Sequence, residues 1–92
     1  MEVDDQTVLR RSDRAAFEVA AGEAIVIDLE SGTYFSLNEV GTVFWQRLDG
    51  QQTLRQHAEA IATDYDVDVS VAVADLIELA ARLCSDRLVD VG

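Results

Sequence analysis

Several residue types on which other classes of protein depend are missing or scarce in this chain of 92 residues. It has no lysine and no proline, one cysteine (Cys84) and one histidine (His57). A single cysteine cannot form an internal disulfide, so the chain is not a disulfide-stapled secreted scaffold, and a reducing cytoplasm fits it. One histidine and one cysteine cannot build a zinc site without several carboxylates, so we expect no metal and no cofactor.

Positive charge is also scarce. Seven arginines stand against 18 acidic residues, which gives a net charge of −11. Nucleic-acid binding requires a basic face, and so does attraction to an anionic membrane surface. No apolar run approaches the roughly 20 residues of a membrane span, and the acidic N-terminus lacks the basic and apolar regions of a signal peptide. We therefore expect neither a nucleic-acid partner nor a membrane.

The length of the chain leaves room for one domain, residues 1–92, because domains usually take about 100–200 residues. A chain this short can bury one modest core and cannot enclose a deep catalytic cleft. Its hydrophobic fraction of 49% is normal for a globular protein and excludes a disordered acidic tail. We expect residues 1–7 of the domain to be flexible.

The first half of the chain predicts three strands, at residues 15–19, 24–29 and 33–37. Alternation in the second strand places three apolar residues on one side, namely Ile25, Ile27 and Leu29. Turn residues separate the strands at 20–23 and at 30–32, and Gly32 fits a position that needs a positive φ. These features predict a small antiparallel sheet.

The second half predicts three helices. Asn38 fits the N-cap of a helix that runs to about Leu48, Thr53 begins a capping-box pattern for a second helix to about Thr63, and Asp68 can cap a third from about residue 69 to 86. Residues 87–89 form a short extended end. Three strands followed by three helices predict an α+β domain, and the short connection between the last two helices favours a winged helix-turn-helix with a three-stranded antiparallel sheet.

The predicted third helix is apolar over more than half of its circumference, whereas a surface helix needs a stripe of only about 100°. Two interpretations fit this width. The helix is either buried on two sides by its own domain, or it lines a groove and leaves one apolar flank for a partner. Helical periodicity does not decide between them.

The predicted third strand could lie at the edge of its sheet. Natural edge strands are usually protected by charge or proline, and residues 33–37 contain neither. Either a helix or loop covers this strand, or its edge stays open to receive an extended peptide as an added strand. A bare edge beside an over-apolar helix is the geometry that peptide capture requires.

Four single residues also invite interpretation. We expect Trp45 to anchor the core and His57 to lie at the surface or boundary of the second helix. Cys84 fits a buried structural thiol better than a nucleophile, because the only histidine lies on another helix. Gly41 costs about 0.5–1 kcal/mol in a helix relative to alanine, so we expect the backbone of another segment to approach it closely.

The segment Gly32–Gly41, together with Trp45 and the following Leu48-Asp49-Gly50, resembles the signature of PqqD-like proteins. These RiPP recognition elements are small domains that bind the leader segment of a precursor peptide during ribosomal natural-product biosynthesis. The resemblance extends from about Val8 to Val89.

The resemblance implies a non-catalytic protein in which the leader pairs with the third strand and lies in a groove against the third helix. On the strand, the implied contacts are Thr33, Tyr34, Phe35, Ser36 and Leu37. On the helix they are Ala72, Asp75, Leu76, Glu78, Leu79, Arg82 and Leu83, with Asp75 or Glu78 placed to meet a polar or basic leader side chain. The opposite flank, with Ile77 and Ala81, is the alternative.

The resemblance also implies a second partner, a maturation enzyme such as a leader peptidase or a radical-SAM enzyme, and we favour a lasso-peptide type of system over the PQQ pathway. Two other functions stay open. A winged-helix transcription regulator is disfavoured by Asp75 and Glu78 on the exposed side of the third helix. An acidic carrier or enzyme subunit is disfavoured, because an acyl carrier needs an attachment serine in an Asp-Ser pair and the sequence contains no such pair. The bare edge could also pair with a second copy, as a homodimer.

Overall fold

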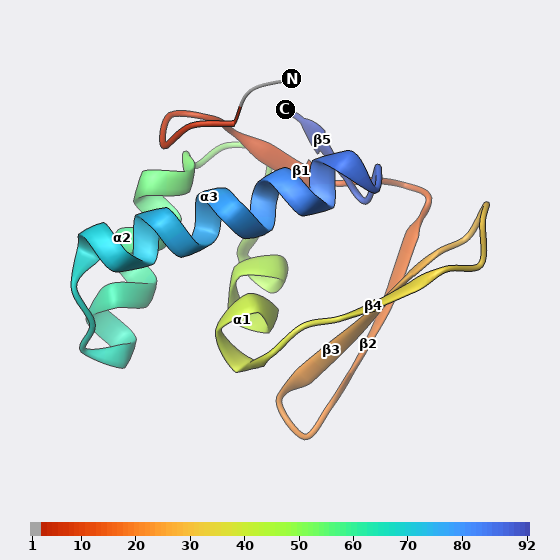
Figure 1. Cartoon of the computed structure of the whole chain (residues 1–92), viewed down its shortest axis with the longest axis horizontal. Helices are drawn as coiled ribbons and strands as arrows, with labels where there is room; N and C mark the ends of the chain where they lie inside the picture. The colour runs from red at the N-terminus through yellow and green to blue at the C-terminus, as the bar shows by residue number, and fades with distance from the viewer. Residues whose placement is uncertain (1–2) are drawn as a thin grey trace.

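The computed structural model describes residues 3–92, which form two antiparallel sheets and three helices (Figure 1). In chain order the elements are β1 (Leu9–Arg11), β2 (Ala15–Ala20), β3 (Glu23–Asp28), β4 (Tyr34–Ser36), α1 (Glu39–Arg47), α2 (Leu54–Tyr65), α3 (Val69–Ser85) and β5 (Val89–Val91). The three-stranded sheet has the order β2-β3-β4. The α+β class and this sheet are confirmed, whereas the separate β1-β5 sheet was not predicted.

Local turn geometry shapes the three-stranded sheet. Ala21 and Gly22 join β2 to β3 with φ angles of 53° and 79°, the pair of positive values that a tight two-residue hairpin turn requires. Gly32, between β3 and β4, has a φ of 75°, as its position in the sequence predicted. The strand order leaves β4 at one edge of the sheet, which confirms the expected edge position.

The two faces of this sheet have different environments. Ala24 and Val26 of β3 are fully buried on the inner face, where the Ala24 N–H donates to Thr42 Oγ1 of α1 at 2.7 Å. Ile25 and Ile27 lie on the outer face and are 44% and 40% exposed. The apolar side of β3 that the sequence pattern indicated, with Ile25 and Ile27, therefore faces outward.

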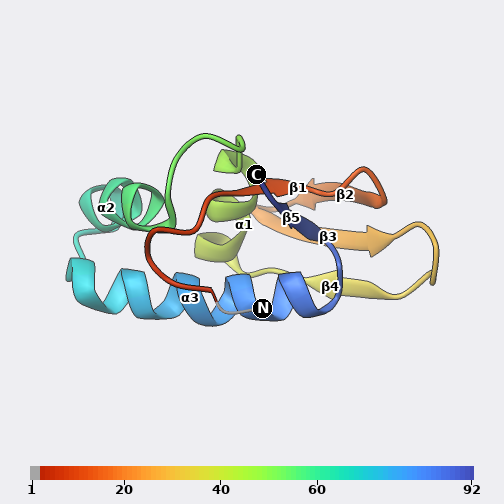
Figure 2. The ribbon, with the colours of Figure 1, turned by 90° about the horizontal axis from the view of Figure 1, so that it is seen from above.

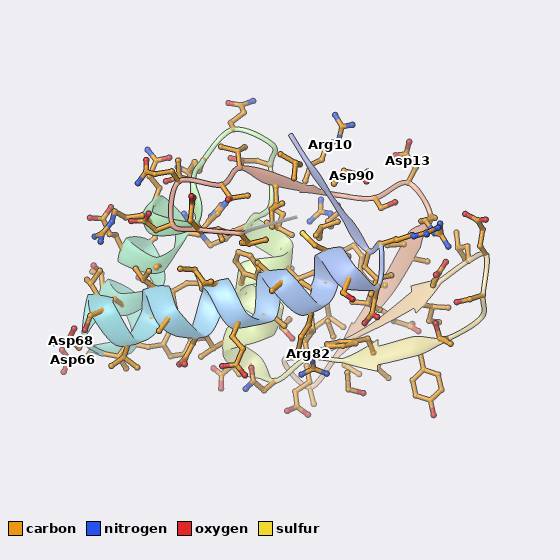
Figure 3. The ribbon with its side chains drawn as sticks, turned by 45° about the horizontal axis from the view of Figure 1, so that its top comes forward. Arg10, Asp13, Asp66, Asp68, Arg82 and Asp90 are labelled. Atoms are coloured by element: carbon orange, nitrogen blue, oxygen red, sulfur yellow. The ribbon has the colours of Figure 1, made fainter. Side chains whose placement is uncertain are left out.

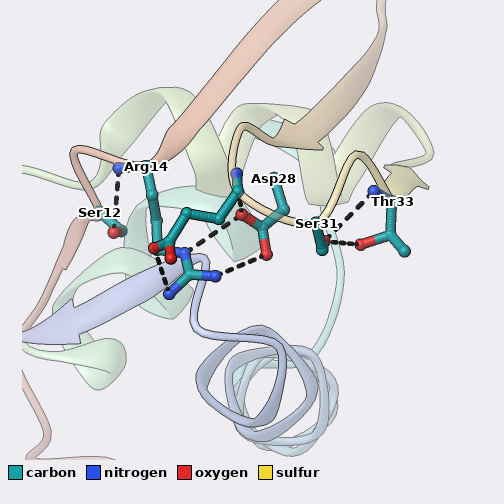
Figure 4. A network of polar contacts seen from close by, with 6 residues as sticks. Ser12, Arg14, Asp28, Ser31 and Thr33 are labelled. Atoms are coloured by element: carbon teal, nitrogen blue, oxygen red, sulfur yellow. Dashed lines mark hydrogen bonds and ion pairs between the residues drawn. The ribbon is translucent and has the colours of Figure 1, made fainter.

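A polar cluster fixes the end of the sheet where β3 turns into β4 (Figure 4). Arg14 donates to both carboxylate oxygens of Asp28, at 3.1 and 3.0 Å, and also contacts Glu30 at 2.8 Å. The Arg14 hydrogen bonds, with the Glu30 backbone N–H, lower the pKa of Asp28 to about 2. On the same connection, Ser31 and Thr33 share a hydroxyl hydrogen bond of 2.7 Å. These contacts hold the start of β4.

The three helices begin at the residues that the sequence indicated. Asn38 Oδ1 accepts from the Gly41 N–H at 2.8 Å, Thr53 and Gln56 form a reciprocal capping box, and Asp68 accepts from the Ser70 N–H at 2.8 Å. Figure 2 shows α3 running along one side of the molecule, past α1 and toward β4. These caps fix where α3 begins and so which of its residues reach β4.

The core corrects one expectation and confirms another. His57 is fully buried, not at the surface, and its ring meets the Phe44 ring edge-to-face with centroids 5.8 Å apart. Burial lowers the pKa of His57, so the ring is held neutral. Trp45 is also fully buried, as expected for a core anchor, and meets Phe17 of the sheet edge-to-face at 5.7 Å.

The described N-terminal segment contacts α1 and α2. Arg11 of β1 donates to the carbonyls of Trp45 and Gln46 at 3.0 and 3.3 Å. These carbonyls lie in the last turn of α1, where the regular helical hydrogen-bond partner is missing. In the segment expected to be flexible, residues 1–2 lie outside the described residues. Asp5 pairs with Arg55 of α2 at 2.9 Å, and the flexibility of residues 1–7 stays a prediction.

Candidate functional site

The outer edge of β4 presents unpaired backbone groups. The Leu37 N–H donates to the Ala24 carbonyl at 2.8 Å, and the Thr33 carbonyl accepts from the Asp28 N–H at 2.9 Å, so residues 33 and 37 face β3. Backbone groups of successive residues in a strand point to opposite sides. The N–H and C=O groups of Tyr34 and Ser36 therefore point to the open edge, where they offer two donors and two acceptors.

A groove of about 390 Å³ lies between β4 and α3. Its lining combines apolar side chains with two carboxylates, a guanidinium and an amide, from Phe35, Ser36, Leu37, Asn38, Val40, Gly41, Asp75, Leu76, Glu78, Leu79 and Arg82. The groove thus answers a question that the sequence left open. The flank of α3 that faces β4 carries Asp75, Leu79 and Arg82, and the alternative residues Ile77 and Ala81 do not line the groove.

The expected contact residues fall into two groups in the structure. Eight of them line the groove: Phe35, Ser36, Leu37, Asp75, Leu76, Glu78, Leu79 and Arg82. The other four do not line it. Tyr34 is 74% exposed on the outer face of the sheet, Thr33 precedes β4, and Ala72 and Leu83 are buried in the core beneath α3. Of these four residues, Tyr34 alone is placed to meet a peptide at the edge, and it does so through its backbone groups and not through its side chain.

Gly41 shows why sequence reasoning missed part of the groove. A Cβ at this position would lie 3.2 Å from Asn38 Oδ1 and 3.4 Å from Leu79 Cδ2. The close neighbours are therefore side chains, and the expected approach of another backbone was wrong. The glycine lets Leu79 of α3 lie against the first turn of α1, which sets the depth of the groove. The sequence showed that Gly41 lies inside a predicted helix, but it did not indicate that Leu79 would be its neighbour.

Arg82 lies at the end of the groove nearest the C-terminus of α3. Its guanidinium carbon is 4.6 Å from the centre of the Phe35 ring, within the range of a cation–π contact. Figure 3 shows Arg82 between α3 and β4, with Asp66 and Asp68 at the far end of α3. Across residues 3–92, neither Asp75 nor Glu78 forms an ion pair, so the rim of the groove presents two carboxylates without a salt-bridge partner.

Other chemistry on the described part of the chain is limited. Burial raises the pKa of the partly buried Cys84 thiol, which suits a structural role better than a nucleophilic one. Between residues 3 and 92, no cluster of three or more histidine, cysteine or acidic side chains could hold a metal ion. Over the same range, no helix has both the length and the apolar character needed to cross a membrane.

A known protein family matches the part of the chain that forms the groove. Residues 23–89 match the family described as "Coenzyme PQQ synthesis protein D (PqqD)". The chain belongs to the PqqD family. The expected resemblance is thereby confirmed, and the match includes β3, β4 and all three helices, and so covers every residue that lines the groove.

Individual named proteins and a solved structure are also similar to this chain. A "PqqA binding protein" of Xanthomonas oryzae pv. oryzae (strain PXO99A) is 34% identical over 92% of this chain and 90% of its own length. Another from Xanthomonas campestris pv. campestris (strain B100) is 40% identical over 56% of each chain. The structure "TbiB1 in Complex with the TbiA(beta) Leader Peptide" superimposes with a TM-score of 0.80 at 27% identity, covering 88% of this chain and 94% of that one.

Proposed function

We propose that this protein is a non-catalytic recognition protein that captures the leader segment of a ribosomally synthesised precursor peptide and presents it to a maturation enzyme. The observation that carries the proposal is the open edge at Tyr34 and Ser36 directly beside the groove. Relatives named for PqqA binding and a similar protein solved with a leader peptide support the same role.

In the proposed complex, the leader adds to β4 as a further strand. Its backbone pairs with the N–H and C=O groups of Tyr34 and Ser36, which supplies affinity without regard to sequence. Alternate side chains of an added strand point to the same face, so every second leader residue enters the groove over Leu79. Asp75 and Glu78 favour a basic or polar side chain at the rim, which makes the selection depend on sequence.

The outer face of the sheet supports docking on the maturation enzyme. Ile25 and Ile27 are exposed there, and the Tyr34 side chain extends the same face to the edge that receives the leader. Exposed apolar patches on small proteins often mark interaction surfaces. An enzyme bound at this face would contact the protein and the outward side chains of the leader together. A leader peptidase and a radical-SAM enzyme are both consistent with this surface.

The acidic rim weighs against the transcription-regulator alternative, because Asp75 and Glu78 would repel DNA phosphates. The short turn between α2 and α3 supports the winged helix-turn-helix interpretation of the fold, which stays a prediction. A homodimer through the β4 edge also stays a prediction. The carrier alternative has no attachment residue to support it.

The test is calorimetric titration with a synthetic leader of the precursor peptide encoded beside this gene. We expect micromolar or tighter binding, equivalent to about 8 kcal/mol or more. A scrambled peptide of the same composition is the control, because it keeps the charge and loses the alternation of side chains. Absence of binding by the true leader would contradict the proposed function.

A further inference from the structure

The groove continues past its end near the N-terminus of α3 into a second cavity. This recess has a volume of about 110 Å³ and lies between the three helices, lined by Val40, Ile61, Tyr65, Val67, Val71, Ala72, Asp75 and Leu76. Three of these residues, Val40, Asp75 and Leu76, also line the groove. The two cavities are therefore parts of one continuous surface along α3.

The recess is apolar and open to solvent. Val67 and Val71, which line it, are 46% and 54% exposed, so their side chains are accessible to a partner. The Tyr65 hydroxyl donates to Glu39 Oε1 at 3.2 Å, which joins the end of α2 to the start of α1 and closes one side. Asp75 is the one carboxylate that lines the recess, and it stands at the junction with the groove.

We propose that this recess is a second anchoring site for the same precursor peptide and takes one aliphatic side chain of it. The inference rests on the proposed function, because the peptide reaches the recess by continuing along α3 from the groove. The volume of about 110 Å³ and the mostly apolar lining suit one branched aliphatic side chain, such as that of leucine, isoleucine or valine. A second copy of this chain is disfavoured as occupant, since each copy carries a net charge of −11.

Helix geometry predicts the spacing between the two anchors. Val71 at the recess and Leu79 at the groove are eight residues apart on α3, which corresponds to about 12 Å along a helix axis. An extended peptide advances about 3.3 Å per residue, so the same distance takes about four residues. An even spacing places both peptide side chains on the same face. The peptide should therefore carry two apolar residues four positions apart, with a basic residue between them to meet Asp75.

The experiment compares two variants on α3 by calorimetry, with the synthetic leader of the neighbouring precursor gene as probe. Val71→Gln removes an apolar wall of the recess, and we expect it to weaken binding at least fivefold. Ala74→Gln introduces the same side chain at an exposed position of the same helix outside both cavities, and we expect less than a twofold change. Circular dichroism melting checks that both variants fold. Val67→Ser is a second recess variant whose position precedes α3, so it leaves the helix intact.

The peptide side of the contact is tested with the same titration. Alanine in place of the aliphatic residue four positions from the groove anchor should weaken binding to the wild-type protein and have little further effect on Val71→Gln. Methyl NMR signals of Ile61 and Val71 should shift when the peptide is added. Unchanged binding by Val71→Gln and Val67→Ser, with loss of binding by Leu79→Asp, would overturn this inference alone. Failure of the wild-type protein to bind would overturn the proposed function and this inference with it.

Discussion

The two edges of the three-stranded sheet offer the same backbone chemistry in different surroundings. The Arg14 carbonyl accepts from the Leu29 N–H at 2.8 Å, so alternation directs the N–H groups of Phe17 and Val19 to the open edge of β2. Tyr34 and Ser36 do the same at β4. However, β2 carries the charged side chain of Glu18, a common protection of an edge strand, whereas β4 carries none and lies beside the groove on α3.

The two edges show that the affinity of strand addition and its selectivity come from different parts of the structure. Unpaired backbone groups at either edge could hold an extended peptide. Only at β4 does the flank of α3 with Asp75 and Leu79 meet the alternate side chains of that peptide. Peptide recognition therefore requires the β4 edge and the facing flank of α3 together.

The largest effect is expected from Leu79→Asp, which places a charge in the apolar part of the groove. An unpartnered polar group in an apolar site costs about 2 kcal/mol or more, so leader binding should fall at least about thirtyfold by calorimetry. Ala81→Asp is the matched control, because it places the same charge on the opposite, exposed flank of α3. Equal losses in the two variants would contradict the assignment of the flank.

A smaller effect is expected from removing one backbone donor at each edge. Ser36→Pro removes an N–H that the fold itself does not use, and we expect about tenfold weaker leader binding, equivalent to about 1.4 kcal/mol. Val19→Pro makes the same change at the edge of β2 and should leave binding unchanged. If Val19→Pro weakened binding as much as Ser36→Pro, the peptide would not be specific for the β4 edge.

The smallest effect is expected from neutralising the rim. Asp75→Asn should weaken binding of a basic leader about twofold to fivefold, because exposed ion pairs contribute about 0.2–1 kcal/mol. The difference from wild type should shrink as salt is raised in the titration. Glu18→Gln on β2 removes one negative charge at the other edge and should change the affinity less. A larger effect of Glu18→Gln would indicate that net charge, and not the rim, attracts the leader.

Local signals made much of this fold predictable. Asn38, Thr53 and Asp68 cap helices through bonds to residues two or three positions away, so the helix starts could be read directly from the sequence. The edge position of residues 33–37 followed from the order of the three predicted strands, and their lack of charge and proline indicated that this edge is unprotected. The same local logic failed for β1 and β5, three-residue strands that pair across almost the whole chain, from Leu9 to Val91.

The site itself was only partly predictable, since its remaining features depend on long-range packing. Helical periodicity showed that α3 is apolar on more than one side, but the flank facing β4 is set by how α3 packs on α1 through Gly41 and Leu79. The recess near Val71 depends on contacts among three helices and has no signature in the sequence. His57 was misplaced for the same reason, because its burial against Phe44 comes from the packing of α2 on α1.

The most direct test of the central claim is amide hydrogen exchange measured by NMR with and without the leader peptide. The account predicts that the N–H groups of Tyr34 and Ser36 exchange fast in the free protein and become protected in the complex, while those of Phe17 and Val19 exchange equally fast in both. Protection of Phe17 and Val19, or no change at Tyr34 and Ser36 under conditions where the peptide is bound, would contradict strand addition at β4.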